Sequence, residues 1–269
     1  MGTDNRPIGI LDSGFGGLSI FLAVRSQMPT EPILYFGDSK FAPYGKKDPS
    51  FIKERVEKII NFLIGQEAKL IVVACNTATV TGIDYYRQNF PSVPIVGVVP
   101  VLKTAGKMTK SNKIAILETT TTARSSYQTN LINKFAANCK VVSVACDDLV
   151  VKLENGDLEV AGKALENHLQ KGNLKDVDVL VLGCTHFVFL RKFTQNSSWR
   201  VLDSGEAVAR QVKRIIENNK IAGFGRESIF FTSGDEKAFA KIAGFLIKSE
   251  IKNCQRVGIT NDSDKIHLS

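Results

Sequence analysis

Two cysteines in this sequence stand where a thiol could do chemistry. Cys75 follows the β-branched run of VVACNTAT (72–79), and Cys184 follows that of VLVLGCTHF (179–187). Small polar residues come directly after each, which is typical of a junction between a strand and a helix. Because the N-terminus of a helix lowers the pKa of a thiol, we expect both to form reactive thiolates. The other cysteines suit the role of small buried hydrophobes: Cys139, Cys146 and Cys254.

The residues around Cys184 limit the kinds of thiol chemistry that are open. His186 lies two positions further on, and with only three histidines in the chain it is the natural acid or base partner of this thiol. A Cys184–His186 pair could serve as the nucleophile and base of a hydrolase, but such an enzyme leaves Cys75 unexplained. Two cysteines and one histidine without a C-x-x-C pair make a poor zinc site and a poor redox couple. We therefore expect no metal and no redox pair of thiols.

Two separate thiols suit a proton transfer that inverts a carbon centre. A single base returns a proton to the face from which it came, whereas two groups on opposite faces remove it from one side and deliver it to the other. Such a mechanism needs Cys75 and Cys184 to face each other across a cleft. They lie far apart in the sequence, so the fold must bring them together.

The elements that would position these thiols alternate along the chain. Short apolar runs are separated by longer amphipathic stretches, a pattern that predicts βαβ units and mainly parallel sheets covered on both faces. The predicted strands lie near 7–11, 32–36, 69–74, 94–98, 113–117, 140–145, 177–182, 199–202 and 228–232. The predicted helices lie near 17–28, 50–65, 77–90, 100–109, 123–137, 158–171, 187–194, 205–219 and 235–248.

A weak internal echo indicates two similar halves. GILDSG (9–14) resembles RVLDSG (200–205), and VVACNT resembles VLGCTH. We therefore predict an α/β protein of two similar domains with the active site in the cleft between them. The predicted first domain is discontinuous, the second lies within the first, and a disordered tail ends the chain: 1–98 plus 205–250, 99–204, and 251–269.

The loops that follow the predicted strands are rich in Gly, Ser, Thr and Asn. Ligands of open α/β sheets bind beyond the carboxyl ends of the strands, where backbone N–H groups and helix N-termini favour anions. These loops therefore suit a small molecule that carries carboxylates. GFGGLS departs from the dinucleotide pattern G-x-G-x-x-G at Ser19, which leaves nucleotide binding, with Asp38 at the ribose, as an alternative.

The composition excludes several classes of protein. The chain of 269 residues is long enough for one large or two moderate domains, and its net charge is +8. Its 35 Lys and Arg residues are scattered, so nucleic acid is not an expected partner. No apolar run has the length of a membrane span, and the N-terminus has no signal-peptide pattern. An odd number of cysteines without close pairs predicts reduced thiols and a cytoplasmic protein.

Taken together, these motifs resemble the glutamate racemases, cofactor-independent enzymes that supply D-glutamate for bacterial peptidoglycan. The resemblance runs from about Ile8 to about Ile216 and is closest to the gammaproteobacterial members. It is carried by motifs in a fixed order: DSGFGGLS, YFGD, PYG, ACNTAT, GVVP, the Thr-rich segment that ends in RSSY, GCTHF and DSG.

The resemblance implies a role for each matching residue. Cys75 and Cys184 match the two catalytic thiols, Asp12 the carboxylate that supports the first thiol, and His186 the imidazole beside the second. Glu154 matches a further acidic residue that assists. The implied substrate contacts are Asp12, Ser13, Pro43, Tyr44, Gly45, Asn76, Thr77, Thr119, Thr122, Thr185 and His186.

The resemblance also implies a substrate and partners. The expected substrate is L- or D-glutamate, and the expected process is cell-wall biogenesis, which maintains cell shape. A related aspartate or hydantoin racemase, the Cys184–His186 hydrolase and a non-catalytic binding module are the alternatives. A homodimer, activation by a cell-wall precursor and a second partner such as a topoisomerase are left open, and no membrane association is expected.

Overall fold

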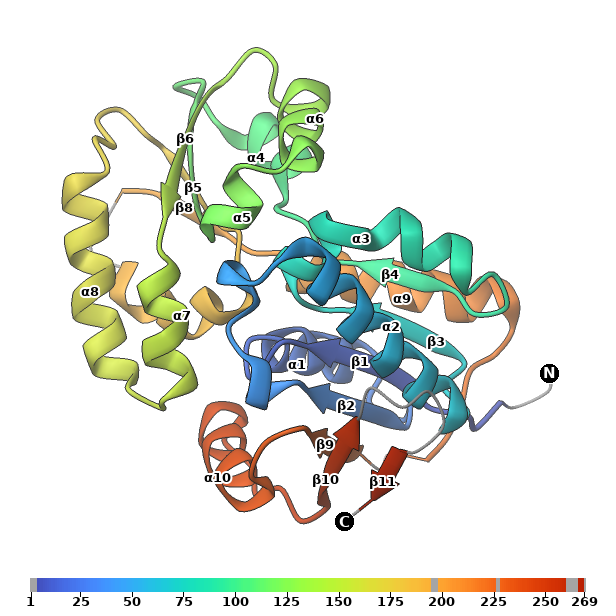
Figure 1. The fold of residues 1–269 in the computed structure, drawn as a ribbon. Helices are drawn as coiled ribbons and strands as arrows, with labels where there is room; N and C mark the ends of the chain where they lie inside the picture. Colours follow the sequence, from blue (N-terminus) through green and yellow to red (C-terminus); the bar gives the residue numbers. More distant parts are fainter. Residues whose placement is uncertain (1–3, 195–197, 226–227, 260–265, 269) are drawn as a thin grey trace.

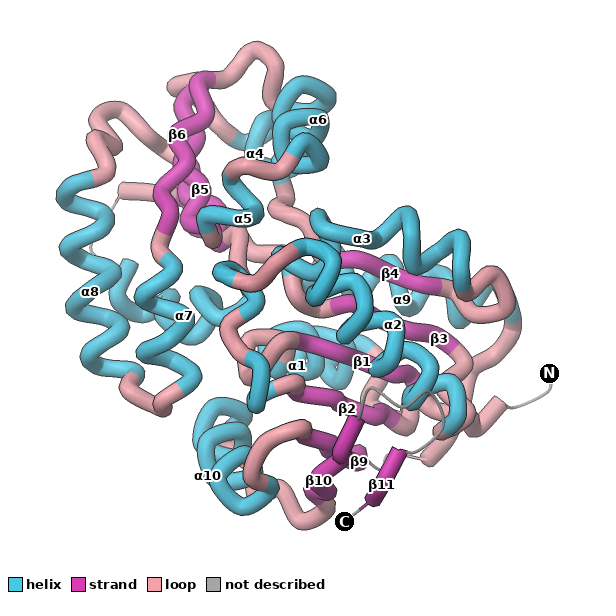
Figure 2. The backbone as a smooth tube through the Cα atoms, viewed as in Figure 1, coloured by secondary structure: helices cyan, strands magenta, loops and turns pink. Residues whose placement is uncertain are grey.

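The chain folds into two α/β units, each built on its own sheet (Figures 1 and 2). We call each sheet with its helices a layer. The computed structural model describes residues 4–194, 198–225, 228–259 and 266–268. None of the helices in this part of the chain combines the length and apolar character that a membrane crossing requires.

The first sheet has the strand order β11-β10-β9-β2-β1-β3-β4 and is parallel except for β11, which pairs antiparallel to β10. Its strands are β1 (Ile8–Asp12), β2 (Ile33–Gly37), β3 (Leu70–Val73), β4 (Ile95–Gly97), β9 (Ser228–Thr232), β10 (Cys254–Ile259) and β11 (Ile266–Leu268). The helices around it are α1 (Leu18–Gln27), α2 (Pro49–Gly65), α3 (Asn76–Asn89), α9 (Gly205–Asn219) and α10 (Glu236–Ile247), with short 3₁₀ turns η1 (Ser39–Phe41) and η2 (Tyr44–Lys46).

The second sheet has the order β6-β5-β7-β8 and is entirely parallel. Its strands are β5 (Lys113–Glu118), β6 (Lys140–Ala145), β7 (Val179–Leu182) and β8 (Arg200–Leu202). Its helices are α4 (Leu102–Met108), α5 (Thr120–Ala123), α6 (Ser126–Phe135), α7 (Asp147–Glu154) and α8 (Leu158–Lys171), and the 3₁₀ segment η3 (Thr185–Thr194) follows β7.

The central strands are apolar along their whole length because helices cover both faces of the sheet. Every residue of β1 and β3 is buried. Two apolar clusters flank the first sheet, one against α1 and α9 and the other against α2 and α3. Burial on both sides removes the polar alternation of a half-exposed strand, which is why the sequence shows continuous β-branched runs.

Strand order places the candidate residues at the switch point of each sheet. From β1 the chain runs to β2 on one side and then to β3 on the other, so the loops after β1 and β3 diverge and leave a crevice. Asp12 ends β1, and Cys75 follows β3. In the second sheet the chain reverses in the same way between β5 and β7. Thr119 follows β5, and Cys184 comes after β7.

Most predicted elements are confirmed, but two expectations are wrong and one helix was not predicted. Each predicted strand and helix has a counterpart, but the predicted helix at 187–194 is the 3₁₀ segment η3. The sequence interpretation missed α7 altogether. The tail predicted to be disordered instead contributes β10, which pairs in parallel with β9 through Cys254–Phe230 and the next two positions. Residues 260–265 and 269 lie outside the described residues.

The two sheets mark two candidate domains. The first sheet draws strands from both ends of the chain, and the second lies wholly between them. We therefore retain the division into 1–98 plus a C-terminal part from 205, and 99–204, as a proposal. Because β10 belongs to the first sheet, the C-terminal part reaches at least Ile259 rather than residue 250.

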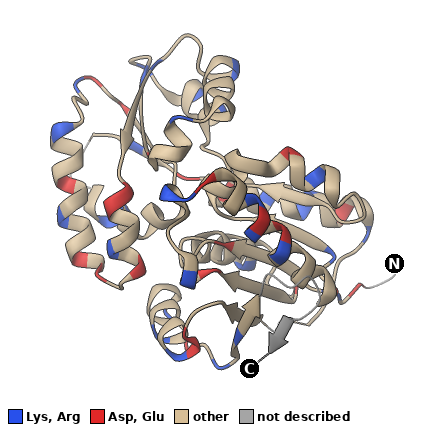
Figure 3. Ribbon diagram, in the orientation of Figure 1, with Lys and Arg blue, Asp and Glu red and all other residues tan. Residues whose placement is uncertain are grey.

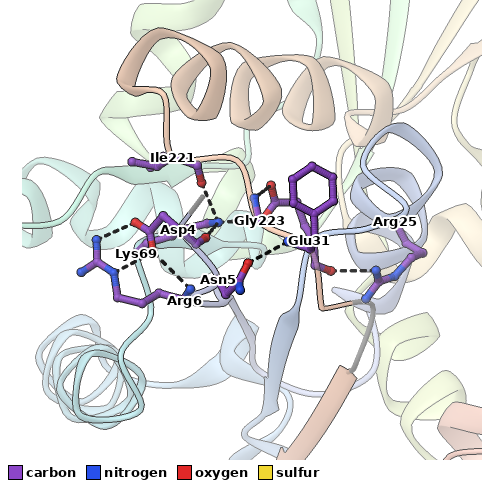
Figure 4. A network of polar contacts seen from close by, with 9 residues as sticks. Asp4, Asn5, Arg6, Arg25, Glu31, Lys69, Ile221 and Gly223 are labelled. Carbon is purple, nitrogen blue, oxygen red and sulfur yellow. Dashed lines mark hydrogen bonds and ion pairs between the residues drawn. The ribbon is translucent and has the colours of Figure 1, made fainter. Parts of the chain in front are cut away.

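A buried lysine ties together three segments at the amino ends of the first sheet's strands (Figure 4). The Lys69 ammonium group donates to the carbonyl oxygens of Asp4 and Ile221 and to the Glu31 carboxylate, each at 2.7 Å. Glu31 accepts a further bond from the Gly223 N–H group at 2.7 Å. A buried charge is tolerated only when it is paired and hydrogen-bonded, and this one has three acceptors.

Candidate active site

Cys75 and Cys184 line one small pocket between the carboxyl edges of the two sheets. Its free volume is about 10 Å³, roughly room for a single water molecule. The fold therefore brings together two thiols that lie far apart in the sequence. The complete lining is Ser13, Pro43, Tyr44, Gly45, Cys75, Asn76, Thr77, Thr119, Asp147, Val150, Cys184, Thr185 and His186.

The first thiol caps a helix. Cys75 is the N-cap of α3, where its sulfur accepts from the Ala78 N–H group at 3.5 Å and donates to the Ser13 hydroxyl at 3.7 Å. Burial, reinforced by the nearby carboxylate of Asp12, raises the pKa of Cys75 to about 12. The expected lowering of this pKa by the helix N-terminus is therefore wrong for the closed pocket, because loss of hydration outweighs the helix effect. Cys75 rests as a neutral thiol.

The second thiol has an ionic pair behind it. The sulfur of Cys184 lies 3.7 Å from Nδ1 of His186, and Nε2 of His186 lies 2.5 Å from Oε1 of Glu154. Burial alone would lower the pKa of His186, but its hydrogen bonds to Cys184 and Glu154 raise that pKa well above the ordinary value. The imidazole is therefore held as a cation beside the sulfur.

Glu154 joins the two layers. It is the last residue of α7 in the second layer, and its Oε1 also accepts from the Phe15 N–H group of the first layer at 2.8 Å. Glu154 does not line the pocket but holds His186 from behind. Its position was predicted from the resemblance, whereas its helix was not predicted.

Asp12 lies behind the glycine loop of the first layer, as Glu154 lies behind His186 of the second layer. It is fully buried, accepts from the Gly14 N–H group at 2.9 Å and receives the Thr185 hydroxyl at 3.3 Å. Burial raises the pKa of Asp12. Asp12 does not line the pocket, so its contacts orient the loop and Thr185.

The glycines of DSGFGG make room for the second layer. A Cβ atom on Gly14 would lie 2.1 Å from Oε1 of Glu154, and one on Gly16 would lie 2.3 Å from Nδ1 of His186. Both distances are shorter than atomic contact allows, so only glycine permits this approach. The dinucleotide alternative is wrong, because the ionic pair of the other layer occupies the glycine loop and Asp38 is engaged elsewhere.

Asp38 forms part of a strut beneath the 43–45 loop. The buried Tyr44 hydroxyl donates to Asp38 at 2.5 Å, and Arg55 donates to both oxygens of the same carboxylate at 2.6 and 3.1 Å. Arg55 also donates to the Ile259 carbonyl at the end of β10, at 3.3 Å. The Tyr44 hydroxyl is thus committed to the protein, and the loop offers the pocket its backbone and ring.

Threonine hydroxyls bridge the two layers on the other side of the pocket. The Thr77 hydroxyl lies 3.0 Å from that of Thr119, which lies 3.0 Å from that of Thr122. Thr119 is the N-cap of α5 and accepts from the Thr122 N–H group. Thr122 therefore orients Thr119 and does not itself reach the pocket.

The pocket contains two residues that the sequence interpretation missed. Asp147 and Val150 come from the first turns of α7. Asp147 accepts from the Thr120 N–H group at 3.2 Å and so closes the wall beside α5. Two acidic residues before apolar positions 149, 150 and 153 could have indicated this helix.

The pocket is polar, but its side chains are not those of a metal centre. Within the residues that the structure describes, His, Cys, Asp and Glu form no group of three or more that could hold a metal ion. Its hydrogen-bond donors are hydroxyls, one side-chain amide, the His186 imidazole and backbone atoms at the N-termini of α3, α5 and η3, and the Asp147 carboxylate also lies in its wall. Such donors suit the carboxylates of a small ligand.

Comparison with known proteins is consistent with this chemistry. A family model described as Asp/Glu/Hydantoin racemase matches residues 19–212. A glutamate racemase from Stutzerimonas stutzeri is 37% identical over 246 residues, which cover 89% of this chain and 93% of the relative.

Solved structures of glutamate racemases share the fold. One isoform from Bacillus anthracis has a TM-score of 0.85 and 30% identity, covering 95% of this chain and 98% of that one. The Escherichia coli enzyme, solved with L-glutamate and the activator UDP-MurNAc-Ala, has a TM-score of 0.84 and 30% identity and covers 95% of this chain and 100% of that one.

Proposed function

This chain belongs to the Asp/Glu/hydantoin racemase family, and we propose that it is a cofactor-independent glutamate racemase. As an isomerase it would interconvert L- and D-glutamate and so provide D-glutamate for peptidoglycan. The observation that carries the proposal is the pair of thiols, one from each layer, in a single enclosed pocket. The similarity to glutamate racemases over most of the chain favours glutamate over aspartate or a hydantoin.

The proposed reaction is a two-base proton transfer. One cysteine, as thiolate, takes the α-proton, so that a C–H bond breaks and an S–H bond forms. The other cysteine, as thiol, donates its proton to the opposite face of the carbon. The enzyme is left with the protonation states of the two sulfurs exchanged, which is the state required by the other enantiomer.

The substrate itself must help to ionise Cys75. With a pKa of about 12, the thiolate costs about 5 kcal/mol at pH 8. A cation within about 4–6 Å lowers such a pKa by roughly 1–3 units. We propose that the ammonium group of bound glutamate supplies this cation, so that the reactive thiolate forms only when the pocket is filled.

Cys184 would use a cation that the protein provides. The imidazolium of His186, held by Glu154, lies against the sulfur and would attract the negative charge that develops there during proton transfer. The two thiols would therefore be activated differently, one by the substrate and the other by the protein. Hydroxyl and amide groups would bind the two carboxylates: Ser13, Asn76, Thr77, Thr119 and Thr185, with the backbone of residues 43–45.

Turnover must also include a separation of the two layers. The pocket has room for about one water molecule, so glutamate cannot bind without an increase in its volume. Side-chain hydrogen bonds between the layers must break for this opening, including Thr77–Thr119, Thr185–Asp12 and the bond from Phe15 to Glu154. Closure would then exclude water from the carbanion-like state.

We also propose a setting for the enzyme. Chemistry that depends on two free thiols favours the reducing cytoplasm. Because the Escherichia coli relative was solved with UDP-MurNAc-Ala as an activator, activation by such a precursor is our proposal for this chain as well. The homodimer, which the sequence leaves open, stays a hypothesis.

The test is to replace each thiol in turn and follow racemization of glutamate by circular dichroism without added cofactor. Cys75→Ser and Cys184→Ser should each lose nearly all racemization, because every turnover uses both groups. Each variant should retain α-proton exchange with deuterated solvent from one enantiomer only, the one whose proton the remaining cysteine removes. Because we assign the D form to Cys75, Cys184→Ser should exchange D-glutamate and Cys75→Ser should exchange L-glutamate. Cys139→Ser, outside the pocket, is the matched control. Racemization by Cys75→Ser at near the parent rate would refute the two-base mechanism and favour the single-thiol alternative.

A further inference from the structure

A second cavity lies directly outside the thiol pocket. Its volume is about 530 Å³, and it lies between η2 with the start of α2 on one side and the α5–α6 connection on the other. Gly45 lines both this cavity and the thiol pocket, so the two spaces are neighbours. The outer one is large enough to hold an amino acid, and the inner one is not.

The outer cavity is lined by cations and by no carboxylate. Lys46 and Lys47 lie on the segment between β2 and α2, and Arg124 is the C-cap of α5; all three are exposed. Lys and Arg elsewhere are distributed over both layers (Figure 3). The ion pairs found in the described part of the chain include none of these three residues, and Lys47 lies over the Phe51 ring, 5.9 Å from its centroid, so the charges of Lys46 and Arg124 are available to a ligand.

A hydrogen bond between the two layers lies at Gly45, the residue that lines both cavities. The Thr121 hydroxyl donates to the carbonyl oxygen of Gly45 at 2.6 Å, and this bond joins the first layer's loop to α5 of the second. Beside it, Thr120 is held by Asp147 of the inner wall. Separation of the two layers would break this bond, beside the one residue that both cavities share.

We propose that the outer cavity is a docking vestibule for the substrate, in which the positive side chains capture a dicarboxylic amino acid before it passes to the thiols. This proposal rests on the proposed function. Glutamate carries two carboxylates and a net charge of −1, and a concave site lined by one sign of charge raises the local concentration of the opposite sign. Arg124 can bind a carboxylate through two parallel hydrogen bonds, and Lys46 adds a mobile point charge.

The vestibule acts on encounter and not on the proton transfer, so it predicts a specific kinetic pattern. Each cation about 10 Å from a single negative charge in water contributes roughly twofold at low ionic strength. Replacing both Lys46→Gln and Arg124→Gln should therefore lower kcat/KM for glutamate about fourfold and leave kcat unchanged. The decrease of kcat/KM with added salt should also become shallower.

Two further variants separate charge from structure. The exchanged pair Lys46→Arg with Arg124→Lys keeps both charges and should keep the parent kcat/KM and salt dependence. Lys163→Gln removes one exposed charge from α8, away from the cavity, and should change neither. Parent values in the double Gln variant, or an equal loss in Lys163→Gln, would overturn the vestibule.

A binding measurement makes the test independent of racemization. Glutarate, a dicarboxylate without an α-ammonium group, can be titrated into each variant by isothermal calorimetry at low salt. Because it carries two net negative charges, the double Gln variant should bind it roughly tenfold more weakly than the parent. If the parent does not racemize glutamate but still binds glutarate more tightly than the double Gln variant, the proposed function is refuted and the vestibule is not. Equal glutarate affinity in the two proteins would refute the vestibule whether or not the parent racemizes glutamate.

Discussion

Removing the charge of Glu154 should change the pH range in which the enzyme works. Glu154→Gln keeps the size of the side chain and an oxygen for the Phe15 N–H group, but it removes the carboxylate that lies 2.5 Å from His186. Two opposite unit charges about 4 Å apart interact by about 4 kcal/mol at an effective dielectric constant of 20. The hydrogen bond to Cys184 and this ion pair together raise the pKa of His186, so removal of the Glu154 charge should lower that pKa.

The effect on activity follows from the fraction of imidazolium that remains. With a lowered pKa, less of His186 is charged at pH 8 than at pH 7. If Cys184 needs this cation, kcat should fall by more at pH 8 than at pH 7, and by at most roughly the thousandfold that about 4 kcal/mol represents. The variant should recover toward pH 6, where the imidazole is protonated again.

The same shift predicts a change in stability. The pKa of His186 is raised on folding, so its stabilising contribution is complete below about pH 6.5 and is lost as the pH rises through the folded-state pKa. In Glu154→Gln this dependence on pH should largely disappear. Urea unfolding of parent and variant at pH 6, 7 and 8 measures it directly.

The assay is the initial rate of glutamate racemization from pH 6 to pH 9, with Glu159→Gln as the control. Glu159 is an exposed acid of α8 that pairs with Lys192 and has no contact with His186. An unchanged pH profile in Glu154→Gln would refute the role of the ionic pair. A loss that is equal at every pH would point instead to damaged folding and would also contradict the argument.

Two other substitutions test how closely the layers approach and how the second layer is charged. Gly16→Ala places a methyl group 2.3 Å from His186, so racemization should fall by about a hundredfold while the thermal unfolding transition is retained; a near-parent rate would mean that the layers need not approach this closely. Burial raises the pKa of Glu118 to about 7, so this residue favours the folded state most below about pH 4.5 and least above pH 7. Between pH 5 and pH 8 the parent should therefore lose up to about 3 kcal/mol more unfolding free energy than Glu118→Gln. Equal losses in urea titrations of both proteins would contradict this.

The sequence predicted the parallel sheets and the thiol loops because these features are local. Strands buried on both faces, such as β1 and β3, appear as continuous apolar runs, and the polar residues after them mark the strand ends. The sequence interpretation did not predict the short helix α7, and it therefore also missed Asp147 and Val150. The sequence interpretation missed β10 because only Val257 of this strand is fully buried, so its residues do not form a continuous apolar run.

Other properties of the site are not local and could not be predicted from short patterns. The pKa of Cys75 is set by burial between two layers, which no neighbouring residue reveals. The hydroxyl of Tyr44 is held by Asp38 and, through it, by Arg55, so its role depends on contacts made after folding. The glycines at 14 and 16 partly matched a dinucleotide-binding loop because both uses require a backbone without side chains.

The Lys69 network bears on how this protein can be shortened or tagged. Its ammonium group depends on the carbonyl oxygen of Asp4, so deletion of the first six residues would remove one of three acceptors from a buried charge. Loss of such an acceptor costs about 1–3 kcal/mol, on the edge of the sheet farthest from the thiols. An affinity tag joined ahead of the chain leaves the Asp4 carbonyl in place, whereas trimming the N-terminus to aid crystallisation would weaken the fold without touching a catalytic group.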